Sequence, residues 1–211
     1  MTHHSTTQLL VLHAVRLEGF GDFEVIAKRA GTSWNEAIEV LEEAERVGWV
    51  QNAAFADLEG WSLTDSGKVE NERQLAAERR WADTADVVTA VYREFLPLNA
   101  RLLRAVTDWQ IAPTDTDRFA PNRHTDPEWD ARVLAELTAL SRELAPLTAR
   151  LAAVLSRFGD YTPRFDSALA KAREGQTAWI DSSGWDSCHR VWFQLHEDLL
   201  ATLGIDRRQE P

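Results

Sequence analysis

Apolar residues recur through most of this chain at spacings of three and four, which is typical of amphipathic helices. The first segments with this spacing are residues 5–17, 23–30 and 33–47. Gly31 follows the second segment, where a residue with a left-handed backbone commonly ends a helix. Ser33 precedes the third segment, and Glu36 stands at the distance that a capping box requires. The pattern therefore predicts three short helices.

A different pattern begins after Gly48. Two short, partly alternating segments, "WVQNAAF" and "GWSLT", flank "ADLEG", which is typical of a two-stranded hairpin. The polar segment "LTDSGK" then leads into a long helix that begins at Thr64 or Asp65. The first part of the chain therefore predicts three helices, a hairpin and a further helix.

Helical spacing continues from Thr64 almost to the end of the chain. Pro97 and Pro146 are expected to break or kink these helices, because proline lacks an amide hydrogen, so the long helix should end near Phe95. A polar segment with prolines, "PTDTDRFAPNRHTDP", separates two predicted helices, and "DSCHRVWFQLHEDLLATLG" forms the last one. The pattern predicts a mainly α protein with a small β-hairpin.

Composition narrows the class of protein. The 211 residues include one cysteine, Cys188, which excludes an internal disulfide framework and fits a reducing compartment. No apolar run is long enough to span a membrane, and the first residues lack the features of a signal peptide. Neither CxxC nor HExxH occurs, and there is no phosphate-cradling glycine loop. We therefore expect a cytoplasmic protein without membrane contact, metal or other cofactor.

The sequence of the first part resembles those of winged helix-turn-helix regulators of the MarR-like group. The likeness rests on "AKRAGTSWNEAIEVLEEAERVGWV" and "LTDSGK" and covers roughly residues 5–80. It implies a winged-helix domain at 1–75, a homodimer, and a third helix that enters the major groove of DNA. The DNA-contacting residues that it implies are Lys28, Arg29, Thr32, Ser33, Trp34 and Asn35.

The second part, residues 76–211, is expected to form a helical bundle for ligand binding and dimerisation. Its segments "FLPLN", "TDWQ" and "HRVWFQLHEDLLATLG" are similar to a helical region of actinobacterial winged-helix proteins. The same region also occurs beside some phosphoenolpyruvate-utilising, dikinase-like enzymes. The resemblance implies a module with a task of its own.

Charge opposes DNA binding. The net charge is −11, and residues 1–75 hold six Lys and Arg against thirteen Asp and Glu. The third helix itself carries Glu36, Glu39, Glu42, Glu43 and Glu45 against Arg46, and the hairpin adds Asp57 and Glu59. Carboxylates beside phosphates cost Coulomb energy instead of releasing counterions. An alternative interpretation is therefore a solvated acidic face on a helix that only packs.

Polar groups on the last predicted helix form the candidate ligand site. A helical wheel places His189 and His196 in the middle of the apolar sector and Asp186 at its edge. The residues expected on the opposite, solvent-facing side are Arg190, Gln194, Glu197 and Asp198. The full set of candidate ligand-binding residues is Asn99, Asp108, Trp109, Gln110, His124, Asp186, His189, Trp192 and His196.

Three interpretations of the two histidines stay open. Each could be a core histidine, bonded to a carbonyl or to Asn99 or Gln110. They could instead line a pocket in which Asp186 orients His189 and His196 contacts a ligand. A metal would need a third ligand, such as His124 or Asp108. The tryptophans 81, 109, 129, 179, 185 and 192 are likewise explained by core packing, an aromatic-lined pocket or a dimer interface.

These observations lead to two main hypotheses of function. The first is a MarR-like transcriptional regulator, a DNA-binding homodimer with a small-molecule pocket in its helical part. The second is a winged-helix scaffold that does not bind DNA and serves as an enzyme or enzyme-associated small-molecule-binding protein. Its acid and base would come from Asp186, His189 and His196. A protein-interaction module acting through the winged helix is the third possibility.

Overall fold

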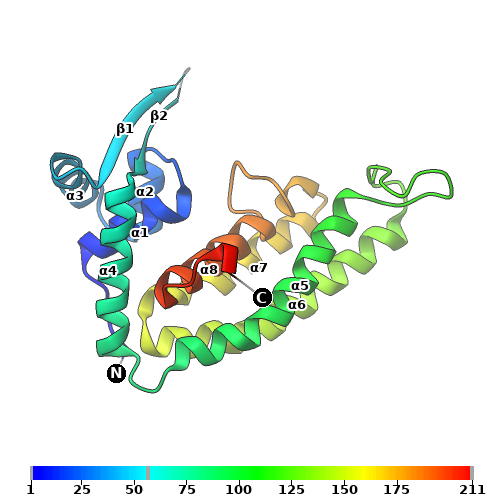
Figure 1. The fold of residues 1–211 in the computed structure, drawn as a ribbon. Helices are drawn as coiled ribbons and strands as arrows, with labels where there is room; N and C mark the ends of the chain where they lie inside the picture. The colour runs from blue at the N-terminus through cyan, green and yellow to red at the C-terminus, as the bar shows by residue number, and fades with distance from the viewer. Residues whose placement is uncertain (1, 56–57, 210–211) are drawn as a thin grey trace. The chain divides into compact units, whose positions relative to one another are not determined.

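The computed structural model describes residues 2–55 and 58–209, which are mainly helical with one two-stranded antiparallel sheet (Figure 1). The chain forms two compact units. The N-terminal unit holds residues 2–85 and the chain from Glu197 onward, and the helical unit holds residues 86–196. The predicted combination of a mainly α fold with a small β-hairpin is confirmed.

The N-terminal unit contains α1 (Thr7–Glu18), α2 (Phe23–Ala30), α3 (Trp34–Arg46), β1 (Val50–Phe55), β2 (Leu58–Leu63) and α4 (Asp65–Ala82). The helical unit contains α5 (Val87–Gln110), α6 (Pro127–Val154) and α7 (Tyr161–Arg173). The last helix, α8 (Cys188–Leu203), belongs to the helical unit up to His196 and to the N-terminal unit from Glu197. Short 3-10 segments cover Ser156–Asp160, Thr177–Trp179 and Arg207–Gln209.

Local sequence signals account for the helix ends of the N-terminal unit. Gly31 closes α2 in the left-handed conformation at φ 64°. The backbone N–H of Glu36 donates to Ser33 Oγ at 3.3 Å, and Ser33 N–H donates back to the Glu36 carboxylate at 3.1 Å. The predicted capping box at the start of α3 is therefore present.

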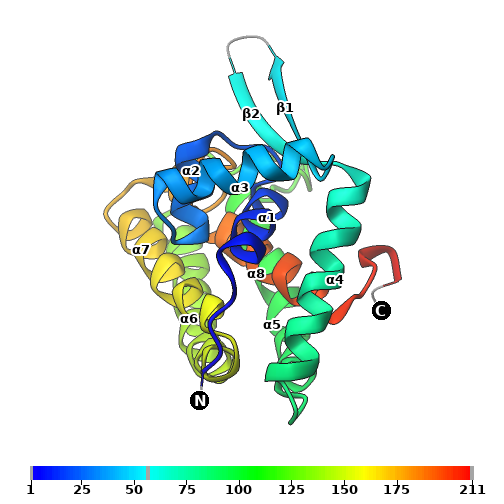
Figure 2. The ribbon, with the colours of Figure 1, turned by 90° about the vertical axis from the view of Figure 1, so that its left-hand side faces the viewer.

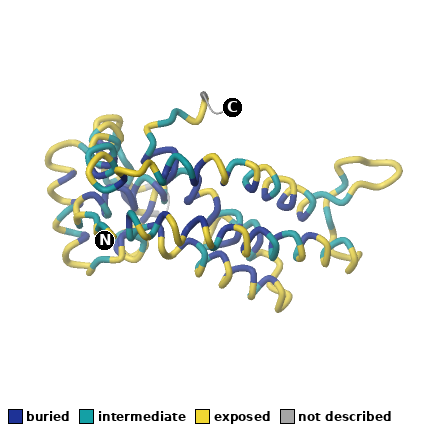
Figure 3. Tube along the Cα trace, turned by 90° about the horizontal axis from the view of Figure 1, so that it is seen from below, coloured by how far each residue is buried: buried dark blue, intermediate teal, exposed yellow. Residues whose placement is uncertain are grey.

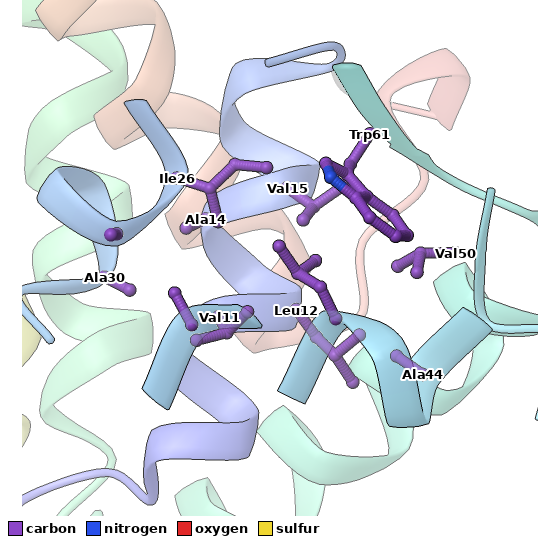
Figure 4. Packing of buried hydrophobic residues seen from close by; sticks show 12 residues of the cluster. Val11, Leu12, Ala14, Val15, Ile26, Ala30, Ala44, Val50 and Trp61 are labelled. Carbon is purple, nitrogen blue, oxygen red and sulfur yellow. The ribbon is translucent and has the colours of Figure 1, made fainter. Parts of the chain in front are cut away.

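The hairpin is anchored to the three helices before it. β1 and β2 pair antiparallel from Val50↔Leu63 to Phe55↔Leu58, and Figure 2 shows them extending beyond the helices of this unit. Trp61 of β2 also pairs with Gly21 in an isolated bridge. Figure 4 shows Trp61 packed beside Val15 of α1 and Val50 of β1, within the buried core of this unit. Asp57, which the sequence placed at the hairpin, lies outside the described residues.

The N-terminal unit reaches beyond the boundary predicted at residue 75. α4 continues to Ala82, and the end of the chain returns to this unit. Leu9 of α1, Leu75 of α4 and Ala201 of α8 share one buried apolar cluster. Burial of these side chains recruits residues that lie far apart in the sequence, which helical spacing alone does not indicate.

The helical unit is built on α5 and α6, which pack together along their length. Figure 3 shows their buried positions recurring at helical spacing and the loop between them as mostly exposed. The fully buried side chains of this unit include Phe95, Leu102, Leu140, Phe165 and Trp192. They form the apolar interior on which the long helices depend.

The two helix breaks predicted at Pro97 and Pro146 do not occur. α5 runs without a break through Pro97, and α6 runs through Pro146. Both prolines are exposed, so water can hydrate the carbonyls that they leave unpaired, and apolar burial on the other face keeps each helix continuous. The predicted long helix instead ends at Ala82, before Asp86 with φ 53°. Aspartate tolerates this conformation, so neither glycine nor proline marks the break.

In the described part of the chain, no helix has the length and apolar character needed to cross a bilayer.

Candidate functional site

The residues predicted to contact DNA lie at the turn between α2 and α3, but half of them are already engaged. The Thr32 and Ser33 hydroxyls donate to the Glu36 carboxylate at 2.8 and 2.6 Å. Hydrogen bonds from Ser33 and Thr32 lower the pKa of Glu36, so a charged carboxylate sits at the start of the helix. Arg29 pairs with Glu18 at 2.8 Å. Thr32 and Ser33 therefore stabilise the turn, and Arg29 links α2 to the end of α1.

The other three predicted DNA contacts are exposed. Lys28 is exposed at the end of α2, and Trp34 and Asn35 are exposed in the first turn of α3. Trp34 leaves 57% of its surface open to solvent and lies 6.2 Å from the Phe23 ring, measured between centroids. This corner offers one cation, one amide and one indole for contact with a partner.

The rest of the exposed face of α3 is acidic. Glu39, Glu42 and Glu43 are all exposed, as the sequence predicts. The one basic residue of this helix, Arg46, pairs with Glu43 at 2.5 Å, and this pairing lowers the pKa of Glu43. The face therefore presents an excess of negative charge.

Asp186 and His189 do not form the predicted pair. Asp186 accepts two hydrogen bonds from Arg164, both at 3.0 Å. His189 is half-buried, and its backbone N–H donates to the Ile180 carbonyl at 2.9 Å. Burial lowers the pKa of His189, and the nearby Asp181 carboxylate opposes part of that effect. The expectation that Asp186 orients His189 is corrected, because a guanidinium offers Asp186 a charged, two-pronged partner.

His196 lies among aromatic side chains. Its ring centroid is 5.4 Å from that of Phe95 and 6.5 Å from that of Tyr92. Trp192 stacks on Phe95, and its indole N–H donates to Asn99 Oδ1 at 3.1 Å. The side-chain oxygen of Asn99, which was expected to bond a histidine, therefore accepts its hydrogen bond from the Trp192 indole. The three candidates Asp186, His189 and His196 occupy three separate environments.

The solvent-facing side predicted for α8 is wrong at two positions. Gln194 and Asp198 are each only 1% exposed, whereas Phe193 between them and His189 is 45% exposed. Gln194 Oε1 accepts a hydrogen bond from Arg164, and Asp198 lies 3.0 Å from His13. A helical wheel assumes that one face of a helix is buried. In α8, residues on more than one face are buried.

The end of α5 supplies two further predicted residues, with different partners. The Trp109 ring is buried and lies 4.5 Å from the ring of His124, whose Nδ1 is 3.0 Å from Asp130. Gln110 Nε2 donates to Asp181 Oδ2 at 2.9 Å. Trp109 and His124 therefore lie together, and Gln110 joins the surroundings of His189.

A cavity of about 490 Å³ opens between α5 and α6, and we call it the α5–α6 groove. Its polar lining is Arg101, Arg104 and Asp108 from α5, with Trp129, Arg132 and Glu136 from α6. Its apolar lining is Ala100, Ala105 and Val133. This volume lies within the roughly 300–1,000 Å³ that is usual for small-molecule sites. Of the predicted ligand-binding residues, Asp108 belongs to it.

One arginine of the groove is neutralised. Arg101 donates to Glu136 at 2.7 Å and to Glu143 at 2.8 Å, and these bonds raise its pKa. The three side chains hold α5 and α6 together, with one cation shared between two carboxylates. Arg101 therefore has a structural role in the groove, and its charge is already balanced by the two carboxylates.

The other two arginines have no such partner. Among residues 2–55 and 58–209, neither Arg104 nor Arg132 has a carboxylate within 4.0 Å. The Arg132 guanidinium lies 5.0 Å from the centre of the Trp129 ring, and Trp129 Nε1 donates to the Asp108 carbonyl at 2.6 Å. The sequence analysis predicts neither arginine, because neither interrupts an apolar face. A signal for Arg104 was its spacing with Arg101 and Asp108 on one face of a helix, and Arg132 had no comparable signal.

A buried polar cluster in the N-terminal unit was also missed. His13 Nε2 lies 3.0 Å from Asp198 Oδ1, and His13 Nδ1 lies 3.4 Å from Asn71 Oδ1. Thr202 Oγ1 donates to Asp198 at 3.1 Å. All four residues are at least 96% buried. The position of His13 in an apolar stripe was the available signal, since a buried imidazole needs partners.

The remaining reactive side chain is Cys188. Burial raises the pKa of its thiol to about 12, so the thiolate is disfavoured at neutral pH. Within the described ranges, no group of three or more His, Cys, Asp or Glu side chains is arranged to hold a metal ion.

Comparison of the chain with protein-family models, curated proteins and solved structures gives no significant match.

Proposed function

We propose that this chain is a winged-helix transcriptional regulator, a homodimer that binds DNA through its N-terminal unit and a small molecule through its helical unit. The observation that supports this best is the order α1, α2, α3, β1, β2, α4, with Trp61 of the hairpin bridged to Gly21. In that arrangement the helix after the turn enters the major groove and the hairpin serves as the wing.

The exposed corner at the start of α3 is the DNA-contacting part of this proposal. Lys28 would bind a phosphate, and Asn35 would donate to and accept from a base edge. The acidic residues farther along α3 limit the interface to this corner and lower its affinity by repelling phosphates. Binding should therefore be weak and confined to low salt unless the site is a good match.

Duplexes selected from a random library and followed by fluorescence anisotropy over a range of salt concentrations test the proposal. Lys28→Ala should weaken binding to all duplexes and make its salt dependence shallower, whereas Asn35→Ala should relax the preference for one sequence. Glu174→Ala, a change outside the N-terminal unit, serves as the control. No binding of any duplex at the lowest salt would refute a DNA-binding role.

The acidic face of α3 favours a second candidate function. Glu39, Glu42 and Glu43 would suit a basic protein surface better than DNA, so the unit would be a scaffold for a partner while the helical unit keeps the small-molecule site. Sedimentation velocity first establishes whether the chain forms the homodimer that the regulator requires.

One pair of substitutions separates the two functions. Glu39→Gln with Glu42→Gln should tighten DNA binding if phosphates approach α3, because repulsion is removed. The same double variant should lose a basic partner recovered by affinity purification if α3 docks on protein.

A further inference from the structure

We propose that the α5–α6 groove binds a small organic anion, whose carboxylate or phosphate group is held by Arg104 and Arg132. This inference deepens the small-molecule part of the proposed function and rests on that part alone. It assigns the ligand to a place and a chemical class, and it does not require that the chain bind DNA.

The charge distribution around the groove carries the inference. Three arginines line the cavity in a chain whose net charge is −11, and two carboxylates, Glu136 and Glu143, both pair with Arg101. Arg104 and Arg132 have no carboxylate within ion-pair distance among the residues that the structure describes. A guanidinium offers several N–H donors in a fixed fork that matches carboxylate and phosphate oxygens. Two such groups on facing helices supply N–H donors for the oxygens of one anion.

The rest of the lining determines the body of the ligand. Ala100 and Ala105 on α5 and Val133 on α6 provide an apolar surface, and Trp129 adds an indole whose N–H is already donated to the Asp108 carbonyl. An apolar or planar group can pack on these side chains once the acid group is bound, because little polar surface is then left unpaired. A bare inorganic anion would leave this surface unused.

Asp108 adds a condition for selectivity. Its side chain is a further carboxylate of the lining, with no ion pair among the described residues. It disfavours a second acid group on the ligand and favours a hydroxyl or ammonium donor at that end. The expected occupant therefore carries one anionic group, an apolar body and, at most, a donor on the other side.

Direct binding to the full chain tests the inference. The probes are benzoate, phenyl phosphate and inorganic phosphate, titrated by calorimetry and by the NMR signal of the Trp129 indole N–H, assigned with Trp129→Phe. Phenyl phosphate or benzoate should bind more tightly than inorganic phosphate and shift that signal, and added salt should weaken the binding. No shift and no heat with any of the three probes would overturn the inference.

Variants connect the binding to the two arginines. Arg104→Met and Arg132→Met should each weaken the tighter organic probe by about tenfold or more, as expected for loss of a charge-assisted hydrogen bond. Both side chains are exposed, so the fold should tolerate methionine. Arg93→Met and Arg142→Met remove exposed arginines of α5 and α6 outside the groove, and they should leave the affinity within about twofold. Equal losses in all four variants would show non-specific attraction and overturn the assignment.

DNA binding is measured separately, by the anisotropy assay with and without the bound anion. Anion binding that depends on Arg104 and Arg132 supports the inference even if no duplex binds, and then only the regulator role fails. If a duplex binds and the anionic probes do not, the groove assignment fails and the regulator role stands.

Discussion

At the scale of single residues, the most consequential pairing is the buried contact between His13 and Asp198. Both imidazole nitrogens face oxygen atoms, Asp198 Oδ1 at 3.0 Å and Asn71 Oδ1 at 3.4 Å. Asp198 also accepts a hydrogen bond from Thr202 at 3.1 Å. The cluster therefore holds a carboxylic acid side chain inside the N-terminal unit, next to polar partners from α1, α4 and α8.

His13→Leu should lower the free energy of unfolding by about 3 kcal/mol, because it removes a polar partner of the buried Asp198 side chain. Urea denaturation measures this loss. His13→Leu combined with Asp198→Leu should be less destabilised than the single variant, since the carboxylic acid group is removed together with its histidine partner. Equal or greater destabilisation of the double variant would mean that packing, not charge, accounts for the loss.

His189 gives the chain a pH dependence with a defined sign. Burial lowers its pKa below the usual 6.5, so below that pH the unfolded chain binds a proton that the folded chain does not. Stability from this residue is present above about pH 6.5 and is lost as the pH falls toward the depressed value. Urea midpoints should therefore drop less between neutral and mildly acidic pH in His189→Gln than in the unmodified chain. His4→Gln, at an exposed histidine, is the matched control variant, and the same change in pH dependence there would contradict the assignment to His189.

At the scale of elements, the continuity of α5 and α6 through proline separates local preference from tertiary packing. Proline at a helix interior costs about 3 kcal/mol relative to alanine in isolated helices. Here Phe95 and Leu98 flank Pro97 and are buried, so the packed face keeps the helix intact. The cost remains in the folded state and lowers the stability of the helical unit.

Pro97→Ala should raise the free energy of unfolding by about 1 kcal/mol or more, because it restores an amide donor at an exposed position. Pro146→Ala in α6 is the matched variant and should act in the same direction. Thermal and urea unfolding followed by circular dichroism measure both. A loss of stability would mean that the fixed backbone angle of proline is itself needed.

At the scale of the whole molecule, the C-terminal residues form part of the N-terminal unit. Residues from Glu197 onward group with the N-terminal unit, where Ala201 joins Leu9 and Leu75, and Glu197 pairs with Arg16 at 2.9 Å. The core of the N-terminal unit therefore includes side chains from the last helix. This organisation differs from a simple order of one domain after another.

A stop after His196 should expose α1 and α4 to faster amide hydrogen exchange, because it removes the contacts of Asp198 and Ala201. A stop after Ile205 keeps all of α8 and should preserve the slow exchange of both helices. Hydrogen exchange followed by mass spectrometry resolves these segments. Unchanged protection in the shorter chain would show that residues 2–85 are stable without the last helix.

The local features of this protein follow from short-range patterns in its sequence. Spacing predicted the helices α1 to α3 and the hairpin, and residue chemistry placed the capping box at Ser33 and Glu36. These features depend on neighbours three or four residues apart, so a one-dimensional pattern contains them. The acidic face of α3 could also be predicted from the sequence, since exposed glutamates need no distant partner.

Contacts between residues far apart in the sequence depend on how the helices pack. Asp186 was assigned to His189 and binds Arg164, while Asp198 was placed in solvent and is buried beside His13. The α5–α6 groove joins Arg104 and Arg132 from two helices separated by a long loop. Burial, charge pairing and cavity shape arise where elements pack, and the energies involved depend on contacts that the order of residues does not specify.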